Sequence, residues 1–394
     1  MNTSYRMTKI AAYMGYVTQA IVNNLTPLLF VTFSKQFDMT LEKISLLITI
    51  NFVAQILTDL LSAKYISKIG YRPACVLAHA LATIGLCCYA ILPFVLPSFL
   101  GLAISCVLCA VGGGLDEVII SPVIEALPSD NKASDMSLLH SFFSWGQMAV
   151  VIGSTVFFKT IGIQNWRFLP IIWSVIPLVD TIMFLKVPIL ELHEDEASIK
   201  VGTIFARKEF WVLLIIMICA GASELAMSQW ASMFAENGLH VSKTMGDLLG
   251  PCMFALFMAI CRTIYGIKGE KMDLQKYMFI SGLLCVVGYL VASKVSNPFI
   301  ALMGCAVVGF SVGLMWPGAY SIGAAKIPEG GAKMFALLAF AGDVGCTSGP
   351  DVVGLIGDKT GSLQVGLSYG TIFPIVLMIG IIVLWMFEKK AKEK

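Results

Sequence analysis

The sequence has few charged residues: Asp, Glu, Lys and Arg together make up 13% of its 394 positions. Soluble globular chains carry about a quarter charged residues. Hydrophobic residues make up 57% and the mean hydropathy is +0.83, so most of the surface of this chain has to face lipid. The same composition excludes a disordered chain and a secreted disulfide scaffold. The net charge of +2 gives no indication of nucleic-acid binding.

Motifs of several other classes are also absent. No G-x-x-x-x-G-K-[ST] loop is present to bind ATP phosphates, which excludes an ATP-driven transporter for this chain. No H-E-x-x-H helix and no Ser/His/Asp pattern indicates an enzyme. The 11 cysteines lie mostly inside apolar runs and the 4 histidines are scattered. We therefore expect a protein that is not an enzyme and that has no metal and no cofactor.

Apolar runs of membrane-spanning length are what the sequence does contain. A helix of about twenty apolar residues crosses the roughly 30 Å of hydrocarbon in a bilayer. The sequence predicts an all-α membrane protein with twelve such helices, because lipid offers no partner for an open strand edge. The predicted spans are 8–34, 41–63, 73–95, 98–126, 135–159, 166–188, 209–236, 244–266, 275–296, 298–325, 332–356 and 363–387.

The longest hydrophilic stretch divides the spans into two sets of six. We predict an N-terminal half over 1–190, a cytoplasmic linker over 191–208 and a C-terminal half with a short basic tail over 209–394. A weak internal repeat supports this division, and prolines at Pro122 and Pro317 predict a break in the fourth and the tenth span. Six-plus-six halves around a midplane site are typical of secondary transporters.

The distribution of basic residues predicts the orientation. Roughly three quarters of the 27 Lys and Arg residues fall on the side of the N-terminus, which is the excess that marks cytoplasmic segments. We therefore expect both termini in the cytoplasm. The short loops favour a multi-pass protein of a prokaryotic cytoplasmic membrane.

Seven acidic residues of the predicted spans lie at membrane depth. A charge at the centre of a bilayer costs about 2.5–3.5 kcal/mol, so these groups have to face a cavity, a partner or the interior of the helix bundle, or be protonated. A carboxyl buried away from water can exchange a proton near neutral pH, which is the chemistry of proton coupling. The seven are Asp59, Asp116, Glu117, Asp180, Glu224, Asp343 and Asp351; the candidates for proton coupling are Glu117, Asp116, Glu224 and Asp343.

Further polar residues recur at helical spacing within the spans. Asn51, Gln55 and Asp59 follow each other at intervals of four residues, which places them on one face of a helix. Amides in spans commonly join helices, but amides together with aromatic rings also suit a polar solute. The candidate substrate-binding residues are Gln19, Asn23, Asn51, Gln55, His140, Gln147, Gln229, Trp230, Trp316 and Tyr320.

The loop between the second and third spans carries a family motif. Residues 63–72 read AKYISKIGYR, which resembles the G-x-x-x-D-R-x-G-R-R gating-loop motif of the major facilitator superfamily. Its gating-loop residues would be Lys64, Lys68, Gly70 and Arg72, with Ser67 in place of the motif's aspartate. A weaker copy lies between Arg262 and Lys271. In the superfamily such basic loops bind helix ends and hold one conformation.

Three further segments resemble the fucose permease and its sugar:proton symporter relatives within that superfamily. Residues 115–122 (LDEVIISP) are similar to I-L-E-T-A-A-N-P, residues 138–146 (LLHSFFSWG) to L-H-x-F-F-G-x-G, and residues 23–27 (NNLTP) to N-N-L-N-D. The resemblance places Glu117 on the glutamate that this group uses for proton coupling. It also places Pro27 where the group has a membrane-embedded aspartate.

Together these features predict a twelve-helix secondary transporter that works by alternating access. We expect a monomer in the lipid bilayer that moves a small polar, sugar-like solute together with protons and binds no nucleic acid. One alternative is a proton-driven exporter of amphipathic compounds or drugs, because the 20 methionines suit an adaptable apolar pocket. A second alternative is a non-transporting membrane receptor or sensor.

Overall fold

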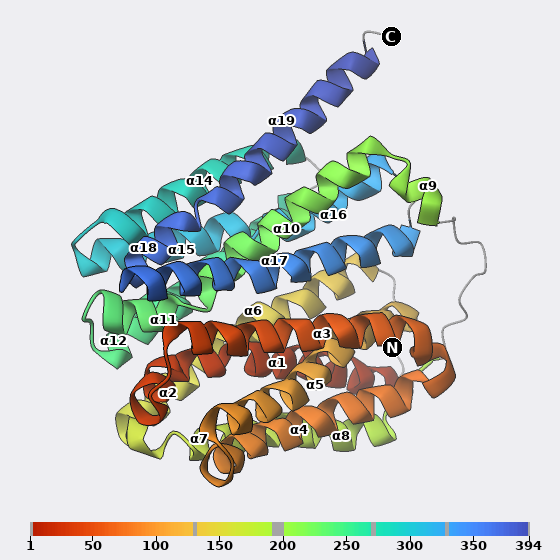
Figure 1. The fold of residues 1–394 in the computed structure, drawn as a ribbon. Coiled ribbons are helices and arrows are strands. Elements are labelled where there is room, and N and C mark those ends of the chain that lie inside the picture. The colour runs from red at the N-terminus through yellow and green to blue at the C-terminus, as the bar shows by residue number, and fades with distance from the viewer. Residues whose placement is uncertain (1–2, 129–131, 191–200, 269–272, 328–330, 393–394) are drawn as a thin grey trace. The chain divides into compact units, whose positions relative to one another are not determined.

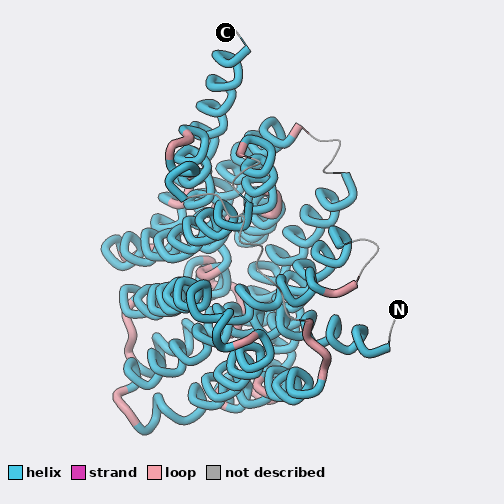
Figure 2. Tube along the Cα trace, turned by 90° about the vertical axis from the view of Figure 1, so that its right-hand side faces the viewer, coloured by secondary structure: helices cyan, strands magenta, loops and turns pink. Residues whose placement is uncertain are grey.

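The computed structural model describes residues 3–128, 132–190, 201–268, 273–327 and 331–392. Helices joined by short loops make up these ranges (Figure 1, Figure 2). A helix satisfies its backbone N–H and C=O groups within the same segment, which is the condition for a chain inside lipid. The all-α fold class predicted from the sequence is confirmed.

The first six predicted spans correspond to eight α-helices and two 3₁₀ turns. Long straight helices account for most of them, and the first and sixth spans are each interrupted. The elements are α1 (Thr3–Asn24), η1 (Thr26–Leu29), α2 (Phe30–Phe37), α3 (Leu41–Ile69), α4 (Tyr71–Val95), α5 (Ser98–Ala126), α6 (Lys132–Thr160), η2 (Ile163–Asn165), α7 (Phe168–Trp173) and α8 (Val175–Lys186).

The remaining elements follow the same pattern, with more interruptions. They are α9 (Val201–Phe205), α10 (Lys208–Ser228), α11 (Ala231–Met233), η3 (Phe234–Gly238), α12 (Lys243–Asp247), η4 (Leu248–Cys252), α13 (Met253–Lys268), α14 (Leu274–Lys294), α15 (Pro298–Val312), α16 (Met315–Lys326), α17 (Gly331–Thr360), α18 (Leu363–Tyr369) and α19 (Ile372–Lys392). Here η3 and η4 are single π-helical turns.

Local chemistry accounts for several helix ends. The side chains of Thr40 and Asn297 accept hydrogen bonds from the first backbone N–H groups of α3 and α15, which lack partners inside the helix. Pro298 occupies the first turn of α15, where no N–H is needed. Gly70 joins α3 to α4 with φ of +87°, a backbone conformation that favours glycine.

The two predicted proline breaks have different outcomes. The tenth span is interrupted between α15 and α16, just before Pro317, as predicted. The fourth span is not: α5 continues through Pro122 to Ala126, so that part of the prediction is wrong. A proline removes one backbone hydrogen bond, and a membrane helix that packs against neighbouring helices tolerates this loss.

In the part of the chain that the structure describes, ten helical segments are long and apolar enough to cross a membrane. The two other long helices are α1, with 22 residues, and α17, with 30. Both of them carry candidate polar residues, namely Gln19 and Asn23 on α1 and Asp343 on α17. The ten segments together with α1 and α17 overlap the positions of the twelve predicted spans, and a count of twelve membrane-spanning helices stays a prediction.

The helices group into two compact units. The first unit comprises Met1–His193 and Lys243–Leu248, and the second comprises Glu194–Ser242 and Leu249–Lys394. Each unit contains its own buried residues, and each is described here by itself.

Glycines let the central helices of each unit approach closely. In the first unit a Cβ atom added to Gly112 of α5 would lie 2.7 Å from the carbonyl oxygen of Ala78 on α4. In the second unit a Cβ atom at Gly345 of α17 would lie 1.9 Å from the carbonyl oxygen of Ile218 on α10. Small residues at helix contacts are the usual basis of close packing in membranes. These contacts bring together the helices that carry the buried carboxyl groups.

Candidate functional site

Three amide side chains from two helices meet in the first unit, and we term them the amide cluster. Asn23 lies near the end of α1, and Asn51 and Gln55 lie one turn apart on α3. The Oδ1 atom of Asn23 accepts hydrogen bonds from Nδ2 of Asn51 at 3.2 Å and from Nε2 of Gln55 at 2.9 Å. Two of the three residues of the polar stripe on the second span, Asn51 and Gln55, are therefore directed at a single residue of the first span.

The carboxyl group of Glu117 on α5 is bonded to an amide of α1, and we term these residues the carboxyl–amide pair. The Nε2 atom of Gln19 donates to Oε2 of Glu117 at 2.7 Å. One turn along both helices, the hydroxyl groups of Tyr16 and Ser121 lie 2.9 Å apart. Hydrogen bonds to an ionised carboxylate are roughly twice as strong as neutral ones. Two polar contacts at successive turns thus join α1 to α5.

The two candidate residues on α6 differ in exposure. His140 is exposed, and its ring meets the ring of Tyr16 edge to face with the centroids 5.1 Å apart. Gln147 is buried, and among the described residues its Oε1 atom has no hydrogen-bond partner. An unpaired buried amide oxygen costs free energy, so Gln147 offers an acceptor to a polar ligand in the first unit.

In the second unit the carboxyl group of Glu224 faces a basic residue of another helix. The Oε2 atom of Glu224 on α10 lies 3.4 Å from Nη2 of Arg262 on α13. Both side chains are substantially buried, with 9% of Glu224 and 23% of Arg262 exposed. Arg262 lies where the predicted span 244–266 overlaps the weaker copy of the loop motif, and the structure places it within α13, which extends to Lys268. The sequence around Glu224 could not indicate this pair, because the basic partner Arg262 belongs to another helix.

The other candidates of the second unit surround the contact between α10 and α17. Asp343 on α17 is buried. The adjacent Gly342 packs against the ring of Trp316, since a Cβ atom added to Gly342 would lie 2.3 Å from a ring atom. The rings of Trp316 and Tyr320 on α16 have centroids 6.3 Å apart. Trp316 thus packs next to the helix turn that carries Asp343.

Gln229 and Trp230 lie at the end of α10. Both are buried, and the indole Nε1 of Trp230 donates to the carbonyl oxygen of Pro350 at 3.0 Å. That bond ties the end of α10 to α17.

The predicted gating loop is a helix junction. Gly70 forms the turn between α3 and α4, and Nη1 of Arg72 donates to the carbonyl oxygen of Phe184 on α8 at 2.9 Å. Arg72 therefore binds the C-terminal part of another helix, where carbonyl groups lack partners inside the helix. The side chains of Lys64 and Lys68 lie outside the described part of the structure.

A buried cluster of three ionisable residues lies elsewhere in the first unit, and we term it the His–Asp cluster. Nδ1 of His79 on α4 lies 3.4 Å from Oδ1 of Asp116 on α5, and Nε2 lies 2.8 Å from Oδ2 of Asp180 on α8. Asp116 thus faces α4 and α8, whereas the adjacent Glu117 faces α1. From the sequence, Asp116 and Asp180 were among the seven acidic residues of the spans, but only Asp116 was a candidate for proton coupling, and His79 was not a candidate. The signal for His79 was present, because a histidine in the middle of an apolar span is a functional candidate in its own right.

Long apolar helices that carry hydrogen-bonded carboxyl and amide groups within the bundle define a multi-pass membrane protein of the secondary-transporter class. The chain belongs to the Major Facilitator Superfamily, whose family model matches residues 12–350. It is a transporter of that superfamily. A search of curated proteins found no match.

Three solved transporters share the fold over nearly the whole chain. The Escherichia coli fucose:proton symporter FucP is 14% identical with a TM-score of 0.66, over 96% of this chain and 99% of that chain. The nucleoside transporter NupG, solved as a mutant, is 12% identical with a TM-score of 0.76, over 96% and 98%. A D-xylose–proton symporter is 12% identical with a TM-score of 0.81, over 97% of each chain. At these identities the likeness establishes the fold alone.

Proposed function

We propose that this transporter carries a small polar, sugar-like solute together with protons by alternating access. In this proposal residues 1–190 and 209–394 form two six-helix halves that are joined by the linker 191–208. The three structural neighbours are named for the transport of sugars or nucleosides, which are solutes rich in hydroxyl groups. We further propose a monomer with both termini in the cytoplasm of a prokaryotic cell.

The carboxyl–amide pair is the observation that carries the proposal. When Glu117 is ionised, it accepts the hydrogen bond from Nε2 of Gln19. When Glu117 takes up a proton, its O–H becomes a donor, and the Gln19 amide can then turn toward another acceptor. A change in protonation thus changes the hydrogen bonds offered at a fixed point between α1 and α5. This is the local event that proton coupling requires.

The amide cluster supplies the groups that recognise the solute. Each amide carries two donors and a carbonyl acceptor, and Asn23, Asn51 and Gln55 point these groups at one another within the first unit. Sugar hydroxyl groups donate and accept in the same way, so they can replace the bonds between the amides when they bind. A site built to hydrogen-bond hydroxyl groups discriminates strongly against analogues that lack them.

The test uses purified protein in liposomes that contain a pH-sensitive dye. Neutral sugars are added one at a time, and internal pH is recorded against empty liposomes. We expect one class of sugar to acidify the interior, Glu117→Gln to abolish the acidification, and Glu42→Gln to leave it unchanged. Glu42 provides a matched control because it is exposed in the first turn of α3.

Acidification that persists in Glu117→Gln would refute the coupling role. If no sugar acts, nucleosides form the second panel. A response to lipophilic cations instead, as alkalinisation of the interior, would favour the exporter of amphipathic compounds.

A further inference from the structure

The His–Asp cluster brings three ionisable side chains together away from water. His79 and Asp180 have no exposed side-chain surface, and Asp116 has 1%. The cluster joins three helices, because His79 belongs to α4, Asp116 to α5 and Asp180 to α8. It is separate from the carboxyl–amide pair, since adjacent residues on a helix point about 100° apart.

The contacts of the imidazole ring determine where protons lie. Nδ1 of His79 lies 2.8 Å from the carbonyl oxygen of Cys75, and a carbonyl group can only accept a hydrogen bond, so Nδ1 carries a hydrogen. Nε2 lies 2.8 Å from the Asp180 carboxyl group. A bare nitrogen lone pair and a carboxylate oxygen repel each other at that distance. A second proton therefore lies between His79 and Asp180, and the Asp116 carboxyl group 3.4 Å from Nδ1 favours its placement on the ring as an imidazolium.

The total charge of the cluster favours a further proton. With the imidazole protonated and both carboxylates ionised, the cluster carries one net negative charge in a dry interior. An uncompensated buried charge is strongly destabilising. Within the described residues, neither oxygen atom of Asp116 has a hydrogen-bond partner that would stabilise its ionised form. One more proton on a carboxyl group makes the cluster neutral.

The surroundings supply little compensating charge. The titratable groups that interact with the carboxyl groups of the cluster are Cys75 on α4 and Tyr16 on α1. Arg72 interacts with Cys75, and its guanidinium Nη1 donates to the carbonyl oxygen of Phe184.

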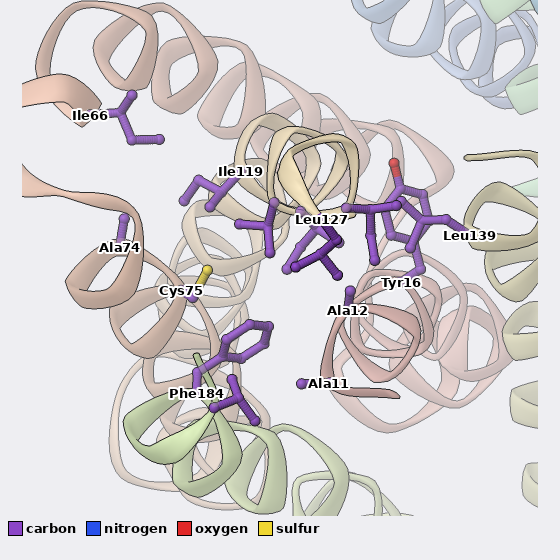
Figure 3. Packing of buried hydrophobic residues seen from close by; sticks show 14 residues of the cluster. Ala11, Ala12, Tyr16, Ile66, Ala74, Cys75, Ile119, Leu127, Leu139 and Phe184 are labelled. Atoms are coloured by element: carbon purple, nitrogen blue, oxygen red, sulfur yellow. The ribbon is translucent and has the colours of Figure 1, made fainter. Parts of the chain in front are cut away.

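The remaining neighbours form an apolar wall. Figure 3 shows Phe184 and Cys75 within a packed set of apolar side chains that also includes Ile119. The Phe184 and His79 rings have centroids 5.1 Å apart. In the described part of the chain, no three His, Cys, Asp or Glu side chains are placed to hold a metal ion. The 2.8 Å contact between Nε2 of His79 and Oδ2 of Asp180 is the length of a hydrogen bond and accommodates a shared proton.

We propose that His79, Asp116 and Asp180 form a second proton-binding site of this transporter, distinct from Glu117. The site exchanges one proton between a neutral and a singly negative state, and its occupancy sets the charge at the junction of α4, α5 and α8. Binding at this site requires no transported solute, so its test is independent of the proposed sugar transport.

The test is nitrogen NMR of the purified protein with ¹⁵N-labelled histidine, combined with infrared difference spectra between acidic and alkaline pH. The chain has 4 histidines, so His79→Gln identifies the His79 signals. We expect His79 to be an imidazolium at neutral pH in the unmodified protein. In Asp180→Asn we expect a neutral ring, because the amide N–H donates to Nε2 in place of the shared proton. We also expect a titrating carboxylic-acid band that Asp116→Asn removes and Glu117→Gln leaves in place.

A neutral His79 whose signals are the same in Asp180→Asn would overturn the proposal, and so would carboxylic-acid bands that belong only to Glu117. Size-exclusion chromatography and circular dichroism verify folding of each variant. If Asp180→Asn fails to fold, Asp116→Asn is measured by the same two methods. In that variant the negative charge of the cluster is removed, so loss of the titrating band with retention of the imidazolium supports the proposal, and an unchanged band refutes it.

Discussion

The contact between Glu224 and Arg262 allows a quantitative prediction about the second unit. Removing the basic partner with Arg262→Met leaves a carboxyl group that is 9% exposed without its ion pair. Breaking a fully buried ion pair costs about 3–5 kcal/mol. The separation of 3.4 Å and the 23% exposure of Arg262 reduce this figure, so we expect a loss of about 1–3 kcal/mol, as for an unpaired buried polar group.

Removing the acidic partner with Glu224→Gln should lower the free energy of unfolding by less than Arg262→Met does. In Glu224→Gln the buried side chain is neutral, and the partly exposed guanidinium of Arg262 can be solvated. The double variant should therefore be more stable than Arg262→Met alone, since the neutral amide tolerates the loss of its partner. The assay is thermal unfolding in detergent, arranged as a double-mutant cycle. Strictly additive effects of the two single changes would refute the inference that these side chains interact.

Two further predictions concern helix packing. Gly345→Ala should prevent α17 from contacting α10, because the added Cβ atom would lie 1.9 Å from the carbonyl oxygen of Ile218; folded yield by fluorescence size-exclusion chromatography should fall sharply, while Gly202→Ala, with nothing within 4 Å, should not change it. Arg72→Leu should lower the unfolding temperature by losing the bond to the Phe184 carbonyl oxygen, and a normal transition in Arg72→Leu would show that this bond contributes nothing to stability.

Much of the helical framework was predictable from the sequence, because lipid allows few alternatives to a helix. Each predicted span overlaps one or more observed helices closely, as for 275–296 against α14 (Leu274–Lys294). The behaviour of the two prolines was not predictable from local sequence. Pro317 lies at the start of α16, where a helix tolerates it, whereas Pro122 lies inside a helix that its neighbours support.

For the candidate sites, the sequence predicts which residues share a face of one helix but not which residues of other helices they contact. Spacing along one helix placed Asn51 and Gln55 on a common face. It could not show that both bond Asn23, because pairing across helices depends on tertiary packing. The location of His79 beside Asp180 depends on the packing of α4 against α8, two helices that are far apart in the sequence. Only the folded structure brings such groups together.

A role of Glu117 in coupling proton movement to transport predicts different effects of its substitution on two modes of transport. In the same liposomes, proton-driven net uptake and equilibrium exchange of the responding solute are compared for the unmodified protein and Glu117→Gln. A coupling residue is needed for the first process and not for the second. We expect Glu117→Gln to retain equilibrium exchange of the solute and to lose its proton-driven accumulation. Accumulation against a gradient that persists in Glu117→Gln would contradict it.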